Sequence, residues 1–147
     1  AIVLFTLVTA CATTTQVEIT PFDTSKTFQK SYGEAWSSLV RFFSTNQISI
    51  GTLEKDSGII TLNGTNLDAA LVRSYCAVAV PFLATMTGGS AQGSATLVEE
   101  SGFVTANVNV RFTASFSSCD LYGRCSYSNK PCKSKGTFEK ALLAALE

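Results

Sequence analysis

The clearest pattern in this chain is a strict alternation of apolar and polar residues between Phe103 and Phe116. Successive side chains of a β-strand point to opposite faces of a sheet. The alternation therefore predicts a strand with one face on a hydrophobic core and the other in water. The predicted core-facing residues are Val104, Ala106, Val108, Val110, Phe112, Ala114 and Phe116.

Two other segments show the three-and-four spacing of apolar residues that is typical of one helical face. The first runs from Tyr32 to Thr45. Ser31, just before it, and Glu34 form a capping-box pair, in which each side chain bonds a free backbone N–H. The second runs from Thr137 to the end of the chain. The apolar faces consist of Tyr32, Ala35, Trp36, Leu39, Val40 and Phe43 in the first helix, and of Phe138, Leu142, Leu143, Ala145 and Leu146 in the second.

Shorter patterns lie between the two helices. Two short strands, Ile48–Leu53 and Gly58–Asn63, are predicted on either side of a polar turn. Apolar residues in Leu67–Pro81 predict a further strand. The glycine-rich run Gly88–Gly93 predicts a flexible loop, because it lacks the lysine and the spacing of a phosphate-binding P-loop.

The order of helix, several strands and helix predicts an α+β domain. We expect an antiparallel sheet with the N-terminal and C-terminal helices packed on one face, in a single domain over residues 21–147. Hydrophobic residues make up 46% of the chain, and this length is sufficient for a sizeable core.

The first nine residues form an uncharged, mostly apolar run that is too short to cross a bilayer as a helix. Val8-Thr9-Ala10-Cys11 resembles the lipobox of bacterial lipoproteins, an aliphatic residue and two small ones before a cysteine. The resemblance implies that residues 1–10 are a truncated signal peptide, that Cys11 carries a diacylglyceryl group, and that residues 11–20 are a tether. Ala12 favours sorting to the outer membrane, facing the periplasm. The alternative is a buried N-terminal strand ending in an ordinary cysteine.

A second resemblance covers Tyr32–Ile60, under a third of the chain. An aromatic residue followed by Ala-Trp in a helix, then a strand, an acidic turn with Gly58 and another strand is similar to the helix-grip pattern of BamC-like lipoproteins. This resemblance implies an accessory role in an outer-membrane assembly.

Cysteine is frequent, and its distribution predicts disulfides. With Cys11 assigned to lipid, an even number remains in an exported chain, namely Cys76, Cys119, Cys125 and Cys132. Four cysteines permit three pairings, and we expect Cys125–Cys132 to close a local loop and Cys76–Cys119 to join two strand ends. Zinc is the alternative, but the cysteines lack the Cys-x-x-Cys spacing typical of structural zinc sites.

We expect residues 117–136 to form a disulfide-stapled loop with a basic and aromatic surface. Such a surface suits an anionic partner or lipid head groups. The alternative is a solvated loop whose charges only keep the domain soluble. The candidate partner-binding residues are Tyr122, Arg124, Tyr127, Lys130, Lys133 and Lys135.

Charge and composition narrow the function. The 11 basic and 11 acidic side chains cancel, which disfavours nucleic-acid binding, and the chain has no histidine, the commonest general base. We therefore expect no enzyme, no cofactor and no metal.

The leading hypothesis is an envelope lipoprotein that acts through protein–protein contacts. The alternative is a carrier that holds a small ligand or lipid between helix and sheet, where Phe42, Phe43, Phe112 and Phe116 would line a cavity or simply fill the core.

Overall fold

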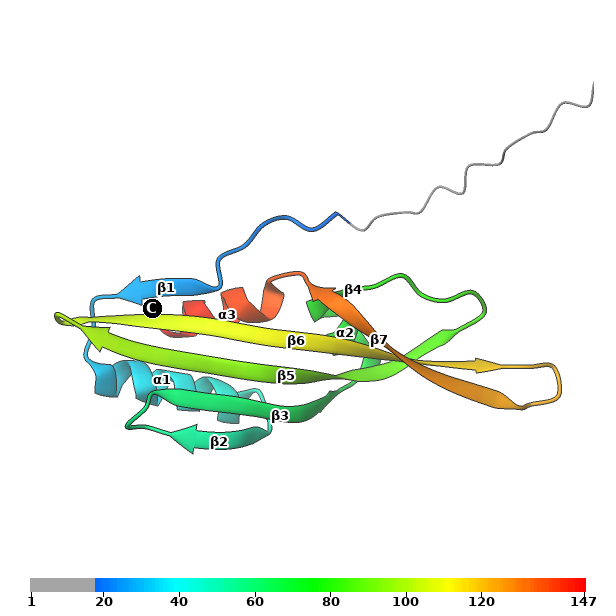
Figure 1. Ribbon diagram of the computed structural model, residues 1–147, viewed down its shortest axis with the longest axis horizontal. Helices are drawn as coiled ribbons and strands as arrows, with labels where there is room; N and C mark the ends of the chain where they lie inside the picture. Colours follow the sequence, from blue (N-terminus) through cyan, green and yellow to red (C-terminus); the bar gives the residue numbers. More distant parts are fainter. Residues whose placement is uncertain (1–17) are drawn as a thin grey trace, which may run out of the picture.

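The computed structural model describes residues 18–147, so the predicted signal peptide and the lipidation site at Cys11 lie outside the described residues. These residues form an antiparallel sheet of seven strands and three helices (Figure 1). The strands are β1 (Ser25–Phe28), β2 (Ile50–Glu54), β3 (Ile59–Leu67), β4 (Cys76–Ala77), β5 (Thr85–Glu100), β6 (Phe103–Cys119) and β7 (Cys125–Ser134). The helices are α1 (Tyr32–Thr45), α2 (Ala69–Tyr75) and α3 (Thr137–Ala145). The predicted α+β class, with a mainly antiparallel sheet, is confirmed.

The long strands β5 and β6 form the middle of the sheet, in the order β2-β3-β5-β6-β7-β4. They pair over their whole length, from Thr85 opposite Ser117 to Glu100 opposite Phe103. The far edge of β6 has two partners: β1 pairs with its first part, and β7 pairs with residues from Phe112 to Cys119. The strand β6 therefore extends from one end of the molecule to the other.

The helix α1 begins and ends where the sequence predicts. Ser31 accepts a hydrogen bond from the Glu34 backbone N–H at 3.3 Å, and the Glu34 carboxylate accepts one from the Ser31 N–H at 3.1 Å. The predicted capping box is confirmed. Leu39 and Phe43 are fully buried, and Trp36 lies in the core as its position in the apolar stripe predicts.

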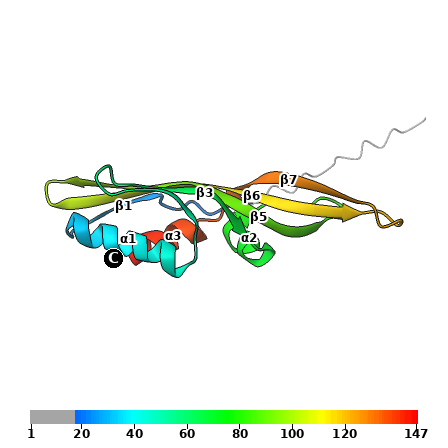
Figure 2. The same cartoon turned by 90° about the horizontal axis from the view of Figure 1, so that it is seen from below.

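The core lies between the helices and the alternating residues of β6. All seven predicted core-facing residues of this strand are buried except Val110, which is partly buried. Helices α1 and α2 contact β5, and α3 contacts β6 and α1. Figure 2 draws the three helices below the strands. The C-terminal helix packs through Phe138, Leu142 and Leu143, whereas Ala145, which we predicted on its apolar face, is exposed.

The prediction of a strand over Leu67–Pro81 is wrong, because Leu67 ends β3, Ala69–Tyr75 form helix α2, and only Cys76–Ala77 form a new strand. Asp68 explains the helix: its side chain accepts a hydrogen bond from the Leu71 N–H at 2.8 Å and caps the first turn. Val72 is the one fully buried side chain of this helix. The apolar residues after Tyr75 have the composition of a strand, but they follow the helix rather than continue a strand.

The prediction of a flexible loop over Gly88–Gly93 is also wrong, because this run lies within β5. Its glycines permit close approach to neighbouring segments. A Cβ atom at Gly89 would lie 2.8 Å from a methyl group of Val72 and would collide with the backbone oxygen of Thr113. Glycine at this position therefore lets α2 pack directly on the sheet.

The predicted loop over residues 117–136 is mostly strand. The turn Asp120–Arg124 connects β6 to β7, and β7 then pairs with β6 from Cys125 to Cys132. Serine, lysine and asparagine hide this strand from a search for apolar alternation, because most of it is solvent-exposed.

The four remaining cysteines form two disulfides, as predicted, but the predicted pairing is wrong. The bonds are Cys76–Cys132 and Cys119–Cys125, with Cα–Cα distances of 5.6 and 4.0 Å. Cys125 and Cys132 lie on the same extended strand, where seven residues span roughly 23 Å, far more than a disulfide allows. The hairpin instead places Cys119 directly opposite Cys125, and the pairing of β4 with β7 brings Cys76 to Cys132.

Candidate functional site

The β6–β7 hairpin extends past the helices at one end of the molecule (Figure 1). The loop between β4 and β5 lies beside it, because the Ser118 hydroxyl donates a hydrogen bond to the Leu83 carbonyl oxygen at 3.2 Å. We call residues 80–83 and 119–127 together the hairpin end. Cys119–Cys125 closes its turn, so the tip is held in place covalently.

Large apolar side chains gather on the hairpin end and are left in solvent. Leu121 is fully exposed, Phe82 is 89% exposed and Tyr122 is 87% exposed. Soluble proteins expose single apolar residues routinely, but several of them at one end of the molecule are characteristic of an interaction site. The exposed apolar residues of the hairpin end are Val80, Phe82, Leu83, Leu121, Tyr122 and Tyr127.

Asp120 organises the tip. Its carboxylate accepts hydrogen bonds at 2.9 Å from the backbone N–H groups of Tyr122 and Arg124, and it pairs with the Arg124 guanidinium at 2.7 Å. Hydrogen bonds from Arg124, first its backbone and then its side chain, hold the pKa of Asp120 below its ordinary value. The guanidinium carbon also lies 5.7 Å from the centre of the Tyr122 ring. The tip therefore presents an aromatic ring and a cation from one ordered turn.

The structure brings only part of the predicted partner-binding set together. Tyr122 and Arg124 share the tip, and Tyr127 lies three residues into the hairpin, opposite Ser117. Lys130 and Lys133 lie farther along β7, and their odd and even positions place them on opposite faces of the strand. Lys135 lies away from the tip, since its ammonium group donates a hydrogen bond to the carbonyl oxygen of Arg73 in α2.

Sequence reasoning missed the apolar half of this surface, namely Leu121, Phe82 and Leu83. Leu121 lies inside the predicted loop, but only charged and aromatic residues were selected there. Phe82 and Leu83 follow Pro81, the last residue of the segment predicted as a strand. An apolar pair directly after a proline, where no strand continues, is the signal that would have identified them.

The opposite end of the molecule is acidic. The β2–β3 turn carries Glu54 and Asp56, and the β5–β6 turn follows Glu99 and Glu100. These two turns are neighbours: Tyr32 donates a hydrogen bond to the Lys55 carbonyl oxygen, and burial, followed by the charges of Asp56 and Glu99, raises its pKa. The molecule thus has an acidic end and, opposite it, an end with exposed apolar side chains.

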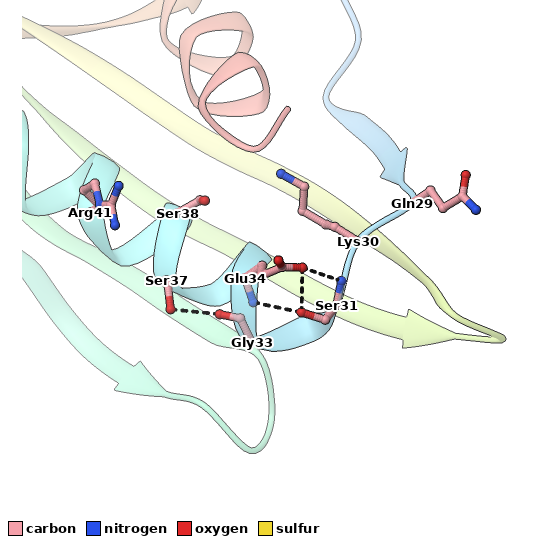
Figure 3. A pocket seen from close by; sticks show the side chains of 8 residues that line it. All are labelled: Gln29, Lys30, Ser31, Gly33, Glu34, Ser37, Ser38 and Arg41. Carbon is pink, nitrogen blue, oxygen red and sulfur yellow. Dashed lines mark hydrogen bonds between the residues drawn. The ribbon is translucent and has the colours of Figure 1, made fainter.

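An open polar depression of about 790 Å³ lies along the first turns of α1 (Figure 3). Lys30 and Arg41 lie at its edges. Ser31 and Glu34 are occupied with the capping box. Glu34, the one acidic side chain of the depression, is therefore already hydrogen-bonded in the helix cap. The other polar side chains of the depression do not converge on one point (Figure 3).

Other chemistry is sparse in residues 18–147. They contain no group of three or more histidine, cysteine, aspartate or glutamate side chains placed to hold a metal ion. No helix among them has the length and apolar character needed to cross a membrane.

No protein-family model matches this chain, and no curated protein matches its sequence.

Proposed function

We propose that this chain is a non-catalytic lipoprotein of a bacterial envelope, anchored by a lipid on Cys11 in the outer membrane and facing the periplasm. Its α+β domain works by protein contact, as an accessory to an envelope assembly. In this proposal α1 and α3 cover one face of the sheet and leave the hairpin end free. The observation that carries the contact function is the group of exposed apolar side chains at a covalently closed tip.

The chemistry of the hairpin end defines its partner. Leu121, Phe82 and Tyr122 supply an apolar and aromatic centre, which is the composition of energetic hot spots in protein interfaces. Lys130 adds positive charge farther along β7, and Arg124 lies at the tip, where it pairs with Asp120. We therefore expect an acidic protein surface with a hydrophobic pocket. The disulfide and the Asp120 turn keep the tip ordered before binding, which lowers the entropic cost of association.

A photo-crosslinking amino acid placed at Leu121 in cells tests the contact. We expect one reproducible crosslinked protein from this position, and none from the same amino acid at Phe103, an exposed apolar residue at the acidic end. The substitution Lys130→Glu should weaken the crosslink by reversing one positive charge of the β6–β7 hairpin. The same products from both positions, or no product from Leu121, would contradict the proposal.

The anchor is tested separately, by intact-mass measurement of protein extracted from membranes. We expect the mass of a chain that begins at Cys11 and carries lipid. An unmodified cysteine at this position contradicts the lipoprotein part of the proposal and leaves the contact part standing.

A further inference from the structure

A second hollow lies between the helices and the sheet, far from the solvent-exposed tip. Its volume is about 360 Å³, and it lies between the end of α1, α2 and α3, over strands β3, β5 and β6. This size falls within the range of pockets that bind small molecules. The cavity is therefore a separate site from the hairpin end. A ligand-binding role of the cavity does not depend on whether the hairpin end binds a protein.

The floor of this cavity is apolar and aromatic. Leu62, Ala91, Phe112 and Phe138 line it, and each is at most 4% exposed in the folded chain. The Tyr75 ring packs 5.7 Å from both Phe112 and Phe138, measured between ring centres. An apolar ring of a ligand would continue this aromatic packing.

The rim is polar and carries no positive charge. Asn46, Gln47, Asn66 and Asp68 line it, and no lysine or arginine does. Asp68 uses Oδ1 to cap α2, and Tyr75 is half-buried, with burial as the cause of its raised pKa. The charge and hydrogen-bonding groups at this rim suit a neutral or cationic molecule and disfavour an anion.

Gln47 lies at this rim because of the way α1 ends. It takes a left-handed backbone conformation, with φ of 54°, at the end of α1. Its N–H bonds the Ser44 carbonyl oxygen at 3.2 Å and the Ile48 N–H bonds that of Phe43 at 3.0 Å, the pattern in which glycine is the usual residue. The left-handed turn therefore ends α1 as a helix cap and places Gln47 at the rim of the cavity.

We propose that this cavity binds a small neutral or cationic molecule with an apolar ring, stacked against the Phe112–Phe138–Tyr75 cluster with its polar edge toward the rim. The Tyr75 hydroxyl and the rim amides supply hydrogen bonds to that edge. Asp68 selects against anionic ligands of the same shape.

Two fluorescent probes test the site because they differ by one sulfonate: neutral N-phenyl-1-naphthylamine and anionic 1-anilinonaphthalene-8-sulfonate. For the full chain in aqueous buffer, we expect one saturable site for the neutral probe and at least tenfold weaker binding of the anionic probe to the same site. Ala91→Leu fills the floor, and Leu71→Ser removes an exposed apolar residue from the rim without entering the core. Each should raise the dissociation constant of the neutral probe by about tenfold.

Phe82→Ser at the hairpin end is the matched control, because it removes an exposed apolar ring that does not line the cavity. It should leave binding of the neutral probe unchanged. Circular dichroism checks the fold of each variant, and Leu71→Ser decides the test if Ala91→Leu does not fold. The proposal is overturned if both cavity variants bind as the parent does, or if Phe82→Ser abolishes binding. Equal affinity for the two probes overturns the assigned ligand charge.

Discussion

Strands β5 and β6 pass through two regions that are built by different means. In the part that packs against the helices, every second residue of β6 except Val110 is buried, and the region is held together by burial of apolar surface. Beyond the helices, the same strand continues into the hairpin end, where apolar side chains lie in solvent and the chain is held by the Cys119–Cys125 disulfide and the Asp120 turn. A surface that must stay apolar and exposed cannot obtain its order from burial, so the protein obtains it from covalent bonds and local hydrogen bonds.

Truncation of a large buried side chain should separate the two regions most strongly. Phe43 is fully buried in the helix-covered region, and Phe43→Ala should lower the free energy of unfolding by about 3–5 kcal/mol because it leaves a cavity. Phe82→Ala at the hairpin end should change it by less than about 0.5 kcal/mol, since that ring is exposed. Urea unfolding of the two variants measures both values. A comparable loss in both would mean that the hairpin end contributes to the core.

Removal of each disulfide should sharpen the comparison. Cys76–Cys132 joins residues 56 apart and Cys119–Cys125 joins residues 6 apart. Loop-closure entropy then predicts that losing the first costs about 4 kcal/mol and losing the second about 2 kcal/mol. Thermal unfolding of the Cys76→Ala/Cys132→Ala and Cys119→Ala/Cys125→Ala proteins tests this order, and the reverse order would contradict it.

Loss of the capping box should have an intermediate effect, confined to the helix-covered region. Ser31→Ala removes the acceptor for the Glu34 N–H and should cost about 1 kcal/mol. Ser37→Ala is the matched control: its hydroxyl only donates to the Gly33 carbonyl oxygen within the helix, so its loss should cost much less. Equal effects in urea unfolding would show that the cap does not stabilise α1.

Acidification should produce the smallest effect, at the hairpin end. The pKa of Asp120 is lowered in the folded protein from an ordinary value of 3.8. Its contribution to stability is therefore complete above about pH 4 and is lost as the pH falls through the lower, folded-state pKa. Amide hydrogen exchange of Tyr122 and Arg124 should accelerate at that low pH while exchange in β6 beneath the helices stays unchanged. Asp120→Asn should show this faster exchange already at neutral pH.

The accuracy of the sequence predictions follows the same division. The helix over Tyr32–Thr45 and the strand from Phe103 were predictable because one face of each lies on the core, and burial imposes its period on the residues. The strand β7 was missed because neither of its faces is buried along most of its length, which leaves no period to detect. The helix α2 was missed because a short helix with one buried residue has too little pattern.

The candidate sites were only partly predictable for a related reason. Tyr122, Arg124 and Tyr127 were selected correctly as exposed, but Phe82 and Leu83 join them across the fold. The cavity draws its lining from α1, β3, α2, β5, β6 and α3, which no local pattern connects.

The sequence by itself determined the two longer helices, the central strand and the capping box, since each depends on residues close together in the chain. It also determined the presence of disulfides, from the even number of cysteines that follow Cys11. Only the tertiary structure decided which cysteines pair, because the register of β6 with β7 places Cys119 opposite Cys125. It alone also decided that the glycine run is a strand, because the need for glycine at Gly89 comes from Val72 in another element. Pairing and close approach are relations between distant segments, and these arise only when the chain has folded.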